Sequence, residues 1–299
     1  MICKTEYAVI YLFQIPLYWN VIPGFGIQFS DGRYHNGKIV KETLEILWEE
    51  LHPLHMSLPT TEYLKSNVKE FENVWNIPRV VGCLDGKHIR IVFPTDSGAM
   101  FFSYKKYFSV VLQGLVDANY KVITVDVGSF GKQSDRDTFL ASDLFSFIDG
   151  KRIIFPEPDF LPHSNVIAPC VMLGDEVMLP YLMKPYERNS LADRRFNFKD
   201  RLSRARKTVE CAFGILYSKW RNISKATETE VELADNIVKC ICVLHNTITE
   251  TEGVERHLTD VTVQTKSVAW ERRGMLPTEA KNIRDLFSLY MEEYPLGYN

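Results

Sequence analysis

Apolar residues first recur at helical spacing in the segment Ile39–Leu51, where the pattern predicts an amphipathic helix. Pro53 lies just beyond and is expected to end this helix, because proline has no backbone N–H to donate and its ring clashes with the preceding turn. The same spacing returns in Thr61–Trp75 and predicts a second helix. Pro78 then separates these two helices from a part of the chain that is rich in strand-forming residues.

The strand-rich part begins with three long apolar runs, Val80–Val92, Ser109–Asp117 and Lys121–Gly128. Residues 118–120, Ala-Asn-Tyr, are a turn signal between the second and third runs. This order predicts an antiparallel meander whose strands are joined by short links. A fourth strand is expected over Val166–Leu173.

Helices are predicted after the meander and beyond the fourth strand. Their expected bounds are Asp135–Ile148, Leu202–Trp220, Val231–Asn246 and Glu279–Tyr294. Three antiparallel strands, a helix, a further strand and flanking helices indicate a layered α/β fold. The expected fold class is therefore α/β, a ribonuclease H-like mixed sheet flanked by helices, with a small N-terminal helical region.

Three carboxylates stand out against this pattern. Asp85 interrupts the first strand, Asp175 follows the fourth strand, and Glu210 lies inside a basic helix. A ribonuclease H-like topology brings these three places together. Carboxylates that are gathered and desolvated repel one another unless a hard divalent cation neutralises them. The sequence therefore favours a metal site, in which two ions about 3.5–4 Å apart could activate a water and stabilise the leaving 3′ oxygen of a phosphodiester.

Two of these acids also have a structural interpretation. Asp85 precedes Gly86, and Asp-Gly is a common turn pair, although a position inside an apolar run counts against a turn. Glu210 follows Arg206 by four residues, so the two side chains could form a salt bridge on the helix surface, where it would contribute little. The sequence alone leaves these alternatives open.

Charge is distributed unevenly along the chain. The formal net charge of the 299 residues is −3, which argues against a protein that coats nucleic acid indiscriminately. Between residues 184 and 225, however, twelve basic and four acidic side chains give a local charge of +8. The basic residues are Lys184, Arg188, Arg194, Arg195, Lys199, Arg201, Arg204, Arg206, Lys207, Lys219, Arg221 and Lys225. A basic stripe beside an essential acid suits a polyanionic substrate, whereas the simpler interpretation is a solvated helix face.

The segment 7–27 is apolar enough to raise the question of a signal peptide or a membrane anchor. Gln14, Pro16, Asn20 and Pro23 interrupt it, and no convincing cleavage site follows. No other stretch is long and apolar enough to span a bilayer. We therefore expect no targeting segment and no membrane association.

Several motifs, in order along the chain, are similar to those of a known family. They are GCLDGKHI (82–89), SVVLQGLVDANYKVITVDVGSFGKQSD (109–135), GDE (174–176), FNFKDRLSRARKTVECAFGIL (196–216) and VLHN (243–246). On these residues the chain resembles the PIF/Harbinger group of transposase-derived nucleases, which are Harbinger-type DDE superfamily endonucleases. The resemblance covers about Thr60 to Asn246, with a weaker similarity at 280–290.

The resemblance implies a nuclease that acts on DNA with a divalent metal cation, Mg²⁺ or Mn²⁺. It also implies a nuclear protein, with the cytoplasm as a second location, that often works with a Myb-like partner for DNA binding or nuclear import. The catalytic acids of the family correspond to Asp85 in LDGKH, Asp175 in GDE and Glu210 in RKTVE, which are also the expected metal ligands. Asp135, in the loop after the third strand, is a fourth ligand candidate.

Asp135 has a strong structural alternative. Ser134 and Asp137 form the start of a capping box, and an aspartate in the first helical turn is favoured by the helix dipole without any metal. Two further acids of this region are given structural roles. Asp117 is interpreted as part of a turn, and Asp126 as a strand residue near the sheet edge.

Basic residues near the acids are candidates for contact with a nucleic-acid backbone. Arg204 and Arg206, about one turn before Glu210, are the stronger candidates because arginine is suited to phosphate. Lys87 and His88 follow Asp85 directly and could also contact a phosphate. For His88 a hydrogen-bonded structural role at the strand is the alternative.

The chain is expected to divide into an unassigned segment 1–36, a helical region 37–78, a DDE nuclease domain 79–248 and a tail 249–299 with one amphipathic helix. The family usually carries a helix-turn-helix-like region ahead of the nuclease core, and here only the first predicted helix resembles its last part. We therefore expect the first segment to reflect a truncated domain or an incorrect gene start. Between Asp175 and Pro185 the chain is also a residue or two shorter than the family pattern, which could disturb the loop that holds Asp175.

Three classes of function follow from the sequence. The first is a metal-dependent DNA endonuclease that hydrolyses phosphodiester bonds. The alternative is a catalytically inactive, domesticated transposase that acts as a DNA- or protein-binding module. A third class is a phosphoryl hydrolase for small substrates, which would not need Arg204 or Arg206.

Overall fold

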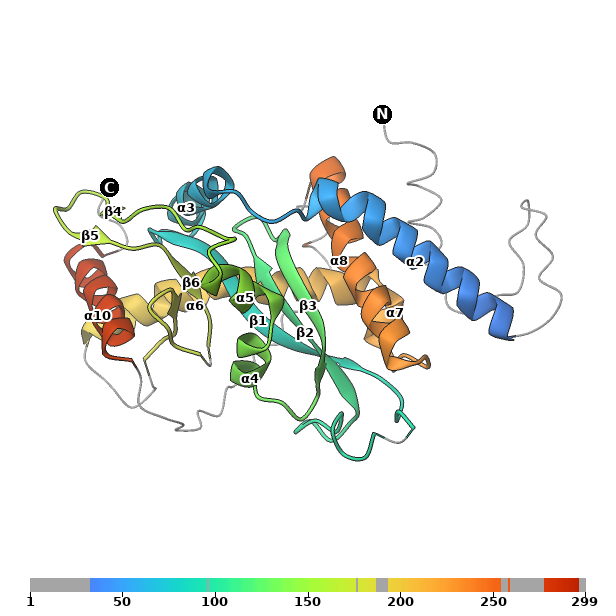
Figure 1. Ribbon diagram of the computed structural model, residues 1–299. Coiled ribbons are helices and arrows are strands. Elements are labelled where there is room, and N and C mark those ends of the chain that lie inside the picture. The colour runs from blue at the N-terminus through green and yellow to red at the C-terminus, as the bar shows by residue number, and fades with distance from the viewer. Residues whose placement is uncertain are drawn as a thin grey trace.

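A five-stranded mixed sheet lies at the centre of the computed structural model (Figure 1). Its strands are ordered β3-β2-β1-β6-β7. They span β1 Val80–Arg90, β2 Ser109–Val116, β3 Val122–Phe130, β6 Val171–Leu173 and β7 Leu182–Met183. The first three form an antiparallel meander, and β6 and β7 continue the sheet in parallel with β1. This is the predicted α/β architecture of ribonuclease H-like type.

The structure describes residues 33–95, 97–175, 177–186, 193–253, 258 and 277–295. The predictions for residues 1–32, including the apolar segment 7–27, and for Arg188 lie outside these residues. Among the helices described, none is long and apolar enough to cross a membrane.

The predicted fourth strand is divided in two. Ile167–Ala168 forms β5, which pairs with β4, Asp159–Phe160, in a separate two-stranded sheet, and only the last three residues of the predicted run form β6. Pro169 lies between the two parts. A proline has no N–H for a strand ladder, so it cannot lie inside a continuous central strand. The short strand β7 was not predicted, because two residues carry no pattern.

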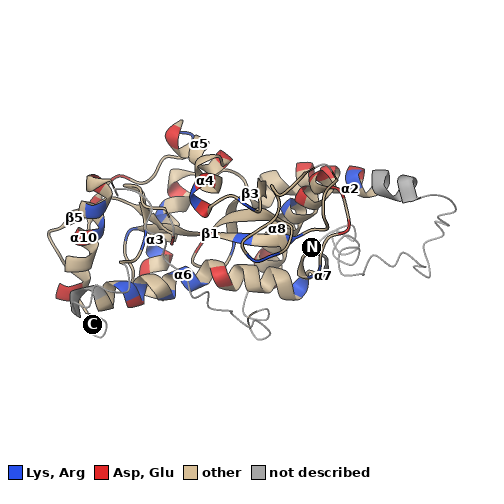
Figure 2. Cartoon of the chain, turned by 90° about the horizontal axis from the view of Figure 1, so that it is seen from below, with Lys and Arg blue, Asp and Glu red and all other residues tan. Residues whose placement is uncertain are grey.

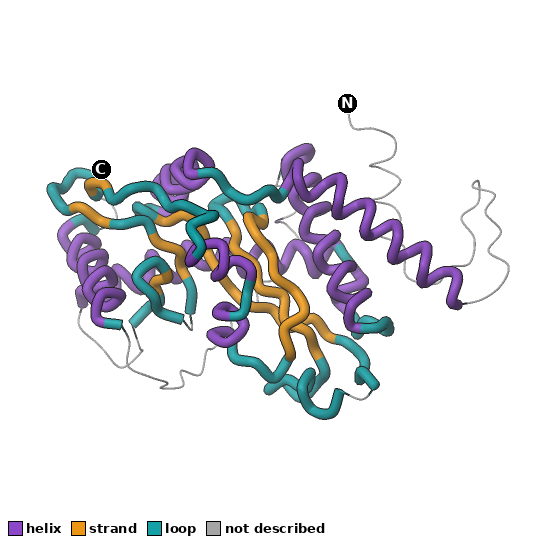
Figure 3. Tube along the Cα trace, viewed as in Figure 1, coloured by secondary structure: helices purple, strands orange, loops and turns teal. Residues whose placement is uncertain are grey.

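The meander differs from the prediction in one link. Strands β2 and β3 are joined by a short turn, as expected, but β1 and β2 are separated by residues 91–108. Figure 3 shows this connection extending beyond the ends of the strands that it joins.

Eight helices are described around the sheets. They are α2 Arg33–His55, α3 Thr61–Trp75, α4 Asp135–Leu140, α5 Asp143–Asp149, α6 Asp193–Lys219, α7 Arg221–Ser224, α8 Val231–Glu252 and α10 Thr278–Glu293. Helix α3 has the predicted bounds. Its N-cap Thr60 accepts a hydrogen bond from the backbone of Tyr63, which satisfies a donor that the first turn leaves unpaired.

Helix α2 continues past Pro53, where the sequence predicted its end. The last turn is held by α8: the amide of Asn246 donates to the backbone oxygen of His55 at 2.8 Å, and His55 Nδ1 lies 2.7 Å from Glu250 Oε2. Tertiary packing thus outweighs the hydrogen bond that the proline removes. Asn246 also exchanges two hydrogen bonds with the backbone of Val122, so the VLHN motif ties α2 and β3 to one helix.

The single helix predicted from Asp135 to Ile148 is broken into α4 and α5. Ser142 starts the second helix, because its hydroxyl accepts a hydrogen bond from the backbone N–H of Phe145. A serine that caps a new helix competes with continuation of the old one.

Helices cover both faces of the sheet (Figure 1). On one face α3, α4 and α5 pack around Leu64, Phe139 and Leu144. On the other face α6 and α8 build a larger core that includes Phe213 and Trp220. The sheet is therefore buried on both sides, which explains its continuous apolar strands.

Candidate metal centre

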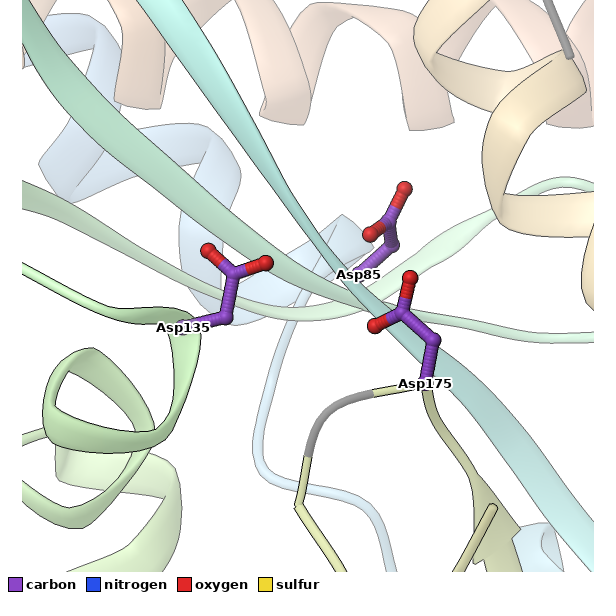
Figure 4. Close-up of side chains that lie close together, drawn as sticks. All are labelled: Asp85, Asp135 and Asp175. Carbon is purple, nitrogen blue, oxygen red and sulfur yellow. The ribbon is translucent and has the colours of Figure 1, made fainter. Parts of the chain in front are cut away.

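Three aspartates converge where the sheet meets the start of α4. Asp85, Asp135 and Asp175 each offer a carboxylate oxygen, and these atoms all lie within 4.8 Å of one another. Figure 4 shows that they come from three segments: Asp85 from β1, Asp135 from the start of α4, and Asp175 from the link that follows β6. Asp85 and Asp175 are buried, with 4% and 7% of their surface exposed.

Strand register brings Asp85 and Asp175 together. In the parallel pair β1–β6, Cys83 lies opposite Leu173, and each aspartate lies two residues beyond its member of this pair. Side chains two residues apart on a strand point to the same face, so neighbouring parallel strands deliver both carboxylates to one edge. Asp85 is paired with Gly114 inside the sheet, and the alternative of an Asp-Gly turn is therefore wrong.

Asp135 joins this group without giving up the predicted helix cap. Ser134 and Asp137 form the capping box: the Ser134 hydroxyl accepts from the Asp137 N–H at 3.1 Å and lies 2.8 Å from the Asp137 carboxylate. The Asp135 carboxylate instead lies against Gly86 of β1, where an added Cβ would come within 2.8 Å of its Oδ1. The helix is thus capped by Ser134 and Asp137, while the Asp135 side chain joins the acidic cluster. The missing side chain of Gly86 leaves the space that the Asp135 carboxylate fills.

Arg206 of α6 is the cation beside these acids. Its Nη2 lies 2.9 Å from Asp175 Oδ2, and its side chain is buried. Burial alone would lower the pKa of Arg206, but the surrounding carboxylates more than offset this and raise the pKa above its usual value. These carboxylates are, in decreasing order of influence, Asp175, Asp85 and Glu210. Arg206 was predicted to contact a DNA backbone. In the structure its guanidinium is instead buried and faces the acids.

Glu210, the third predicted catalytic acid, is not part of the group of three aspartates. It is half-buried on α6, one turn after Arg206, and its charge acts on the Arg206 guanidinium. The Arg206 guanidinium forms an ion pair with Asp175 and is also influenced by the charge of Glu210. Glu210 therefore lies beside the cluster rather than within it.

The basic run around α6 is not one continuous exposed stripe in the described residues. Arg201 is buried and donates to the backbone oxygens of Asn76, at 3.4 Å, and Tyr294. Arg204 is partly exposed and pairs with Asp200 at 3.2 Å, while Lys207 is exposed. Figure 2 shows acidic residues interspersed with the basic ones along this helix. The side chains of Arg194, Arg195 and Arg221 lie outside the described part of the chain.

Lys87 and His88 take different positions after Asp85. The Lys87 ammonium lies over the ring of Tyr217, 4.8 Å from its centroid. The ring of His88 is buried, and its Nδ1 is 2.9 Å from the hydroxyl of Ser109. His88 thus has the hydrogen-bonded structural environment that was its alternative.

Asp117 and Asp126, which were predicted to have structural roles, make hydrogen bonds to the backbone. Asp117 accepts hydrogen bonds from the backbone of Asn119 and Lys121 at 2.8 and 2.9 Å, so it shapes the β2–β3 turn. Asp126 lies on β3 and accepts from the N–H of Asp143 at 2.9 Å.

Gln113, which was not predicted as a site residue, lines the same pocket as the three aspartates. It lies opposite Gly86 in the β1–β2 pair, and 4% of its surface is exposed. Its Nε2 donates a long hydrogen bond, 3.5 Å, to the backbone oxygen of Asp135, and its Oε1 is buried with no hydrogen-bond partner among the described residues. A polar residue inside the otherwise apolar run of β2 was the available signal.

The profile of the DDE superfamily endonucleases matches residues 84–246, more than half of the chain. The chain belongs to this family. The match confirms the resemblance to Harbinger-type nucleases and includes all four predicted acids and Gln113. No solved structure gives a significant match.

Two curated proteins similar to this chain come from Arabidopsis thaliana. One is named Antagonist of Like Heterochromatin Protein 1 and is 24% identical over 226 residues, which are 75% of this chain and 57% of that protein. The other, Protein ALP1-like, is 26% identical over 203 residues, 66% of this chain and 49% of that protein. The chain thus corresponds to about half the length of each.

The donor set of the three aspartates fits a divalent cation. Three carboxylate oxygens converge from separate segments, two of the side chains are buried, and Gly86 leaves room for the third. Hard cations such as Mg²⁺ and Mn²⁺ prefer oxygen ligands of this kind. Asp85, Asp135 and Asp175 are the residues that would hold such an ion.

Proposed function

We propose that this chain is a divalent-metal-dependent DNA endonuclease that hydrolyses phosphodiester bonds. The observation that carries this proposal is the convergence of Asp85, Asp135 and Asp175 within 4.8 Å in a chain of the DDE superfamily endonuclease family. Asp85, Asp175 and Glu210 are the proposed catalytic acids. Asp85, Asp135 and Asp175 are the primary metal ligands, and Glu210 is proposed as an outer ligand.

The reaction is a hydrolysis in which all atoms come from water and DNA. A water oxygen forms a bond to phosphorus while the bond from phosphorus to the 3′ oxygen breaks, and the 3′ oxygen gains a proton. The products are a 3′-hydroxyl and a 5′-phosphate. When bound, Mg²⁺ or Mn²⁺ would supply positive charge that lowers the pKa of water and stabilises the leaving oxygen.

The side chains have distinct roles in this proposal. Asp85 and Asp175 hold their carboxylates in fixed positions because both are buried, Asp85 on the central strand β1 and Asp175 just after β6. Arg206 keeps Asp175 oriented through their ion pair. Arg204 and Lys87, which are less buried, are the proposed contacts to the DNA backbone, where a cation favours phosphate without reading sequence.

Cleavage of labelled DNA tests this function. Purified protein would be incubated with duplex DNA in Mg²⁺ or Mn²⁺, beside Asp85→Asn and Asp175→Asn. We expect each substitution to reduce cutting more than about 100-fold, since it removes a charged ligand. Asp149→Asn, which changes an exposed aspartate at the end of α5, is the matched control and should cut normally. Cutting by Asp85→Asn at the wild-type rate would contradict the proposed mechanism.

A second candidate is a catalytically inactive domesticated transposase that binds DNA or protein. It is favoured by one observation: Arg206 already places a positive charge on Asp175, so the acids can be stable without a metal ion. One relative is named as an antagonist of another protein, which suits a protein-binding role. DNA binding with no cleavage in either metal, by a chain whose melting temperature does not respond to Mg²⁺, would favour this candidate.

We further propose a nuclear protein, or one shared between nucleus and cytoplasm, that works with a Myb-like partner. The support is the resemblance to Harbinger-type nucleases and the name of the heterochromatin-related relative. Fluorescence microscopy of the tagged chain, with and without a co-expressed Myb-like protein, tests it. Nuclear signal that depends on the partner is the expected result, and exclusion from the nucleus in both conditions would contradict it.

A further inference from the structure

Exposed apolar side chains gather on the connection between β1 and β2. We call residues 92–108 the aromatic loop. It holds five of the fifteen large hydrophobic side chains that are exposed in the described residues, and a sixth, Phe130, packs edge-to-face on Phe101 of the loop. The five are Val92, Phe93, Met100, Phe102 and Tyr104. A concentration of this kind in a soluble domain indicates a binding surface.

The same surface is positively charged. Lys105 and Lys106 lie in the loop, Arg90 precedes it, and Lys132 lies on the segment beside it. Between residues 87 and 108 the sequence has one acid, Asp96, against four Lys or Arg residues. Lys105 lies 5.7 Å from the centroid of the Tyr104 ring, so cations and aromatic faces alternate.

Hydrogen bonds hold the loop in a defined shape. Ser109 donates to the backbone oxygen of Phe101 at 2.8 Å, and Ser103 donates to that of Tyr107 at 2.9 Å through both its N–H and its hydroxyl. Tyr104 lies at the tip that these bonds close, and 75% of its surface is exposed. A ring presented by an ordered turn costs little further entropy when a ligand binds.

The aromatic loop is also fixed to the segment that carries Asp135. The N–H of Lys132 donates to the backbone oxygen of Met100 at 3.1 Å. Gly131 lies so close to Phe101 and Ser109 that a side chain there would clash. Asp135 follows Lys132 by three residues, so this contact links the loop to the segment that carries one of the three acids.

We propose that the aromatic loop binds unpaired bases of DNA beside the scissile phosphate, with Tyr104 stacking on a base and Lys105 and Lys106 contacting phosphates. This inference rests on the proposed nuclease function and names the form of its substrate. Aromatic faces stack on any base that is not already stacked, while cations follow the backbone. The excess of Lys and Arg over acidic residues between 87 and 108 favours a polyanion as the ligand.

Binding of fluorescent single-stranded and duplex DNA, with Ca²⁺ in place of Mg²⁺, tests this proposal. In the full 299-residue chain, Tyr104→Ala should weaken single-strand binding at least about fivefold and duplex binding by less than about twofold. The double variant Lys105→Ala with Lys106→Ala should weaken both and flatten the dependence on salt, because fewer counterions are released.

Matched controls distinguish a specific role of the aromatic loop from the effect of removing any exposed ring or cation. Phe160→Ala removes another exposed ring, and Lys65→Ala with Lys69→Ala removes two exposed cations from α3; both should bind DNA normally. Unchanged single-strand binding by Tyr104→Ala, an equal loss in a control variant, or no DNA binding by the wild-type chain would overturn the proposal. The proposal would also be overturned if Tyr104→Ala changed only self-association or protein binding and left DNA binding unchanged.

Failure of the proposed base stacking can be distinguished from failure of the proposed nuclease function. Single-strand binding by the wild-type chain and by Tyr104→Ala is measured in Ca²⁺, and cutting of DNA is measured separately in Mg²⁺. If Tyr104 is needed for single-strand binding but the protein never cuts DNA, only the proposed nuclease function is contradicted. If the protein cuts DNA and Tyr104→Ala binds single strands normally, only the proposed role of the aromatic loop is contradicted.

The geometry also assigns Gln113 to the metal centre, as a neutral oxygen that faces the cation or a water bound to it. Two observations carry this. Gln113 lies opposite Gly86 on the face where the Asp135 carboxylate fills the space of a missing side chain. Its Nε2 donates to the backbone oxygen of Asp135, which leaves the buried Oε1 as the atom with no hydrogen-bond partner in the described residues.

Mn²⁺ binding by titration calorimetry tests the role of Gln113 without relying on activity. Gln113→Leu should lower Mn²⁺ affinity about tenfold, whereas Gln113→Glu, which keeps an oxygen and adds charge, should bind Mn²⁺ at least as tightly as the wild type. Asp126→Asn changes the cross-strand neighbour of Gln113 and should bind normally. Equal affinity in Gln113→Leu and the wild type, or weakened binding in Gln113→Glu, would overturn the assignment.

Discussion

The guanidinium of Arg206 lies 2.9 Å from the carboxylate of Asp175, and both side chains are buried. This ion pair connects α6 to the end of β6 at the point where three aspartates meet. It offsets part of the repulsion among the acids. Arg206 is therefore an internal counter-ion of this acidic cluster.

Removing this counter-ion should destabilise the protein in a way that a metal ion partly reverses. We expect Arg206→Gln to lower the free energy of unfolding by about 3–5 kcal/mol, because it leaves a buried carboxylate uncompensated. Saturating Mg²⁺ should raise the melting temperature of this variant more than that of the wild type. Arg204→Gln, which breaks the more exposed pair with Asp200, should cost less than about 1 kcal/mol. Equal effects of the two substitutions would contradict this role.

A methyl group at Gly86 should disturb the metal centre. Its Cβ would come within 2.8 Å of Asp135 Oδ1 and push that carboxylate away from the other two. We expect Gly86→Ala to lower Mn²⁺ affinity at least about tenfold, as measured by calorimetry. Gly82→Ala is the matched control on the same strand, since its Cβ would meet Leu115 instead. Loss of affinity only in the control would refute this account.

Asp135 and Glu210 should differ in their contribution to metal binding. Asp135 is within the group of three, whereas Glu210 lies beside it on α6. We expect Asp135→Asn to weaken Mn²⁺ binding more than Glu210→Gln does. Calorimetry of both variants against the wild type measures this difference. A larger loss in Glu210→Gln would show that the family pattern predicts the ligands better than the geometry does.

Asp235 should make stability depend on pH. Burial raises the pKa of this carboxyl to about 6, and the charges of Asp126 and Glu232 add to the effect while Lys239 opposes it. The folded state therefore holds a proton more tightly than the unfolded chain, so stability is lost as pH rises from about 4 to about 6.

Asp235→Asn removes that loss. At neutral pH we expect it to be more stable than the wild type by on the order of 1 kcal/mol, a value discounted because the group is partly solvated. Below about pH 4 the difference should vanish. Urea denaturation across this range measures it, with Glu50→Gln on the exposed side of α2 as a control whose difference should not vary with pH. A stability gain that persists at low pH would contradict the assignment.

The sequence predicted the elements that local pattern determines. Continuous apolar runs located β1, β2 and β3, and helical spacing with a Thr cap located α3. Asp85 and Asp175 were recognised because a charged residue that interrupts or ends a buried run is costly without a partner.

Other features depended on packing that no local pattern contains. Pro53 remains inside α2 because Asn246 holds the last turn from a distant helix. The face on which Arg206 lies became clear only from the position of α6 against β6, and Gln113 was hidden in an apolar strand. Asp135 could be read as a cap or a ligand until the gap at Gly86 showed where its carboxylate lies.

Asp85, Asp135 and Asp175 are proposed to hold one divalent cation together. Anomalous diffraction from a crystal of this chain soaked in Mn²⁺ would locate such an ion. We expect an anomalous peak bonded to oxygens of all three carboxylates, about 2.0–2.4 Å from each. A fully soaked crystal with no peak at these residues, and with Arg206 still paired to Asp175, would contradict it.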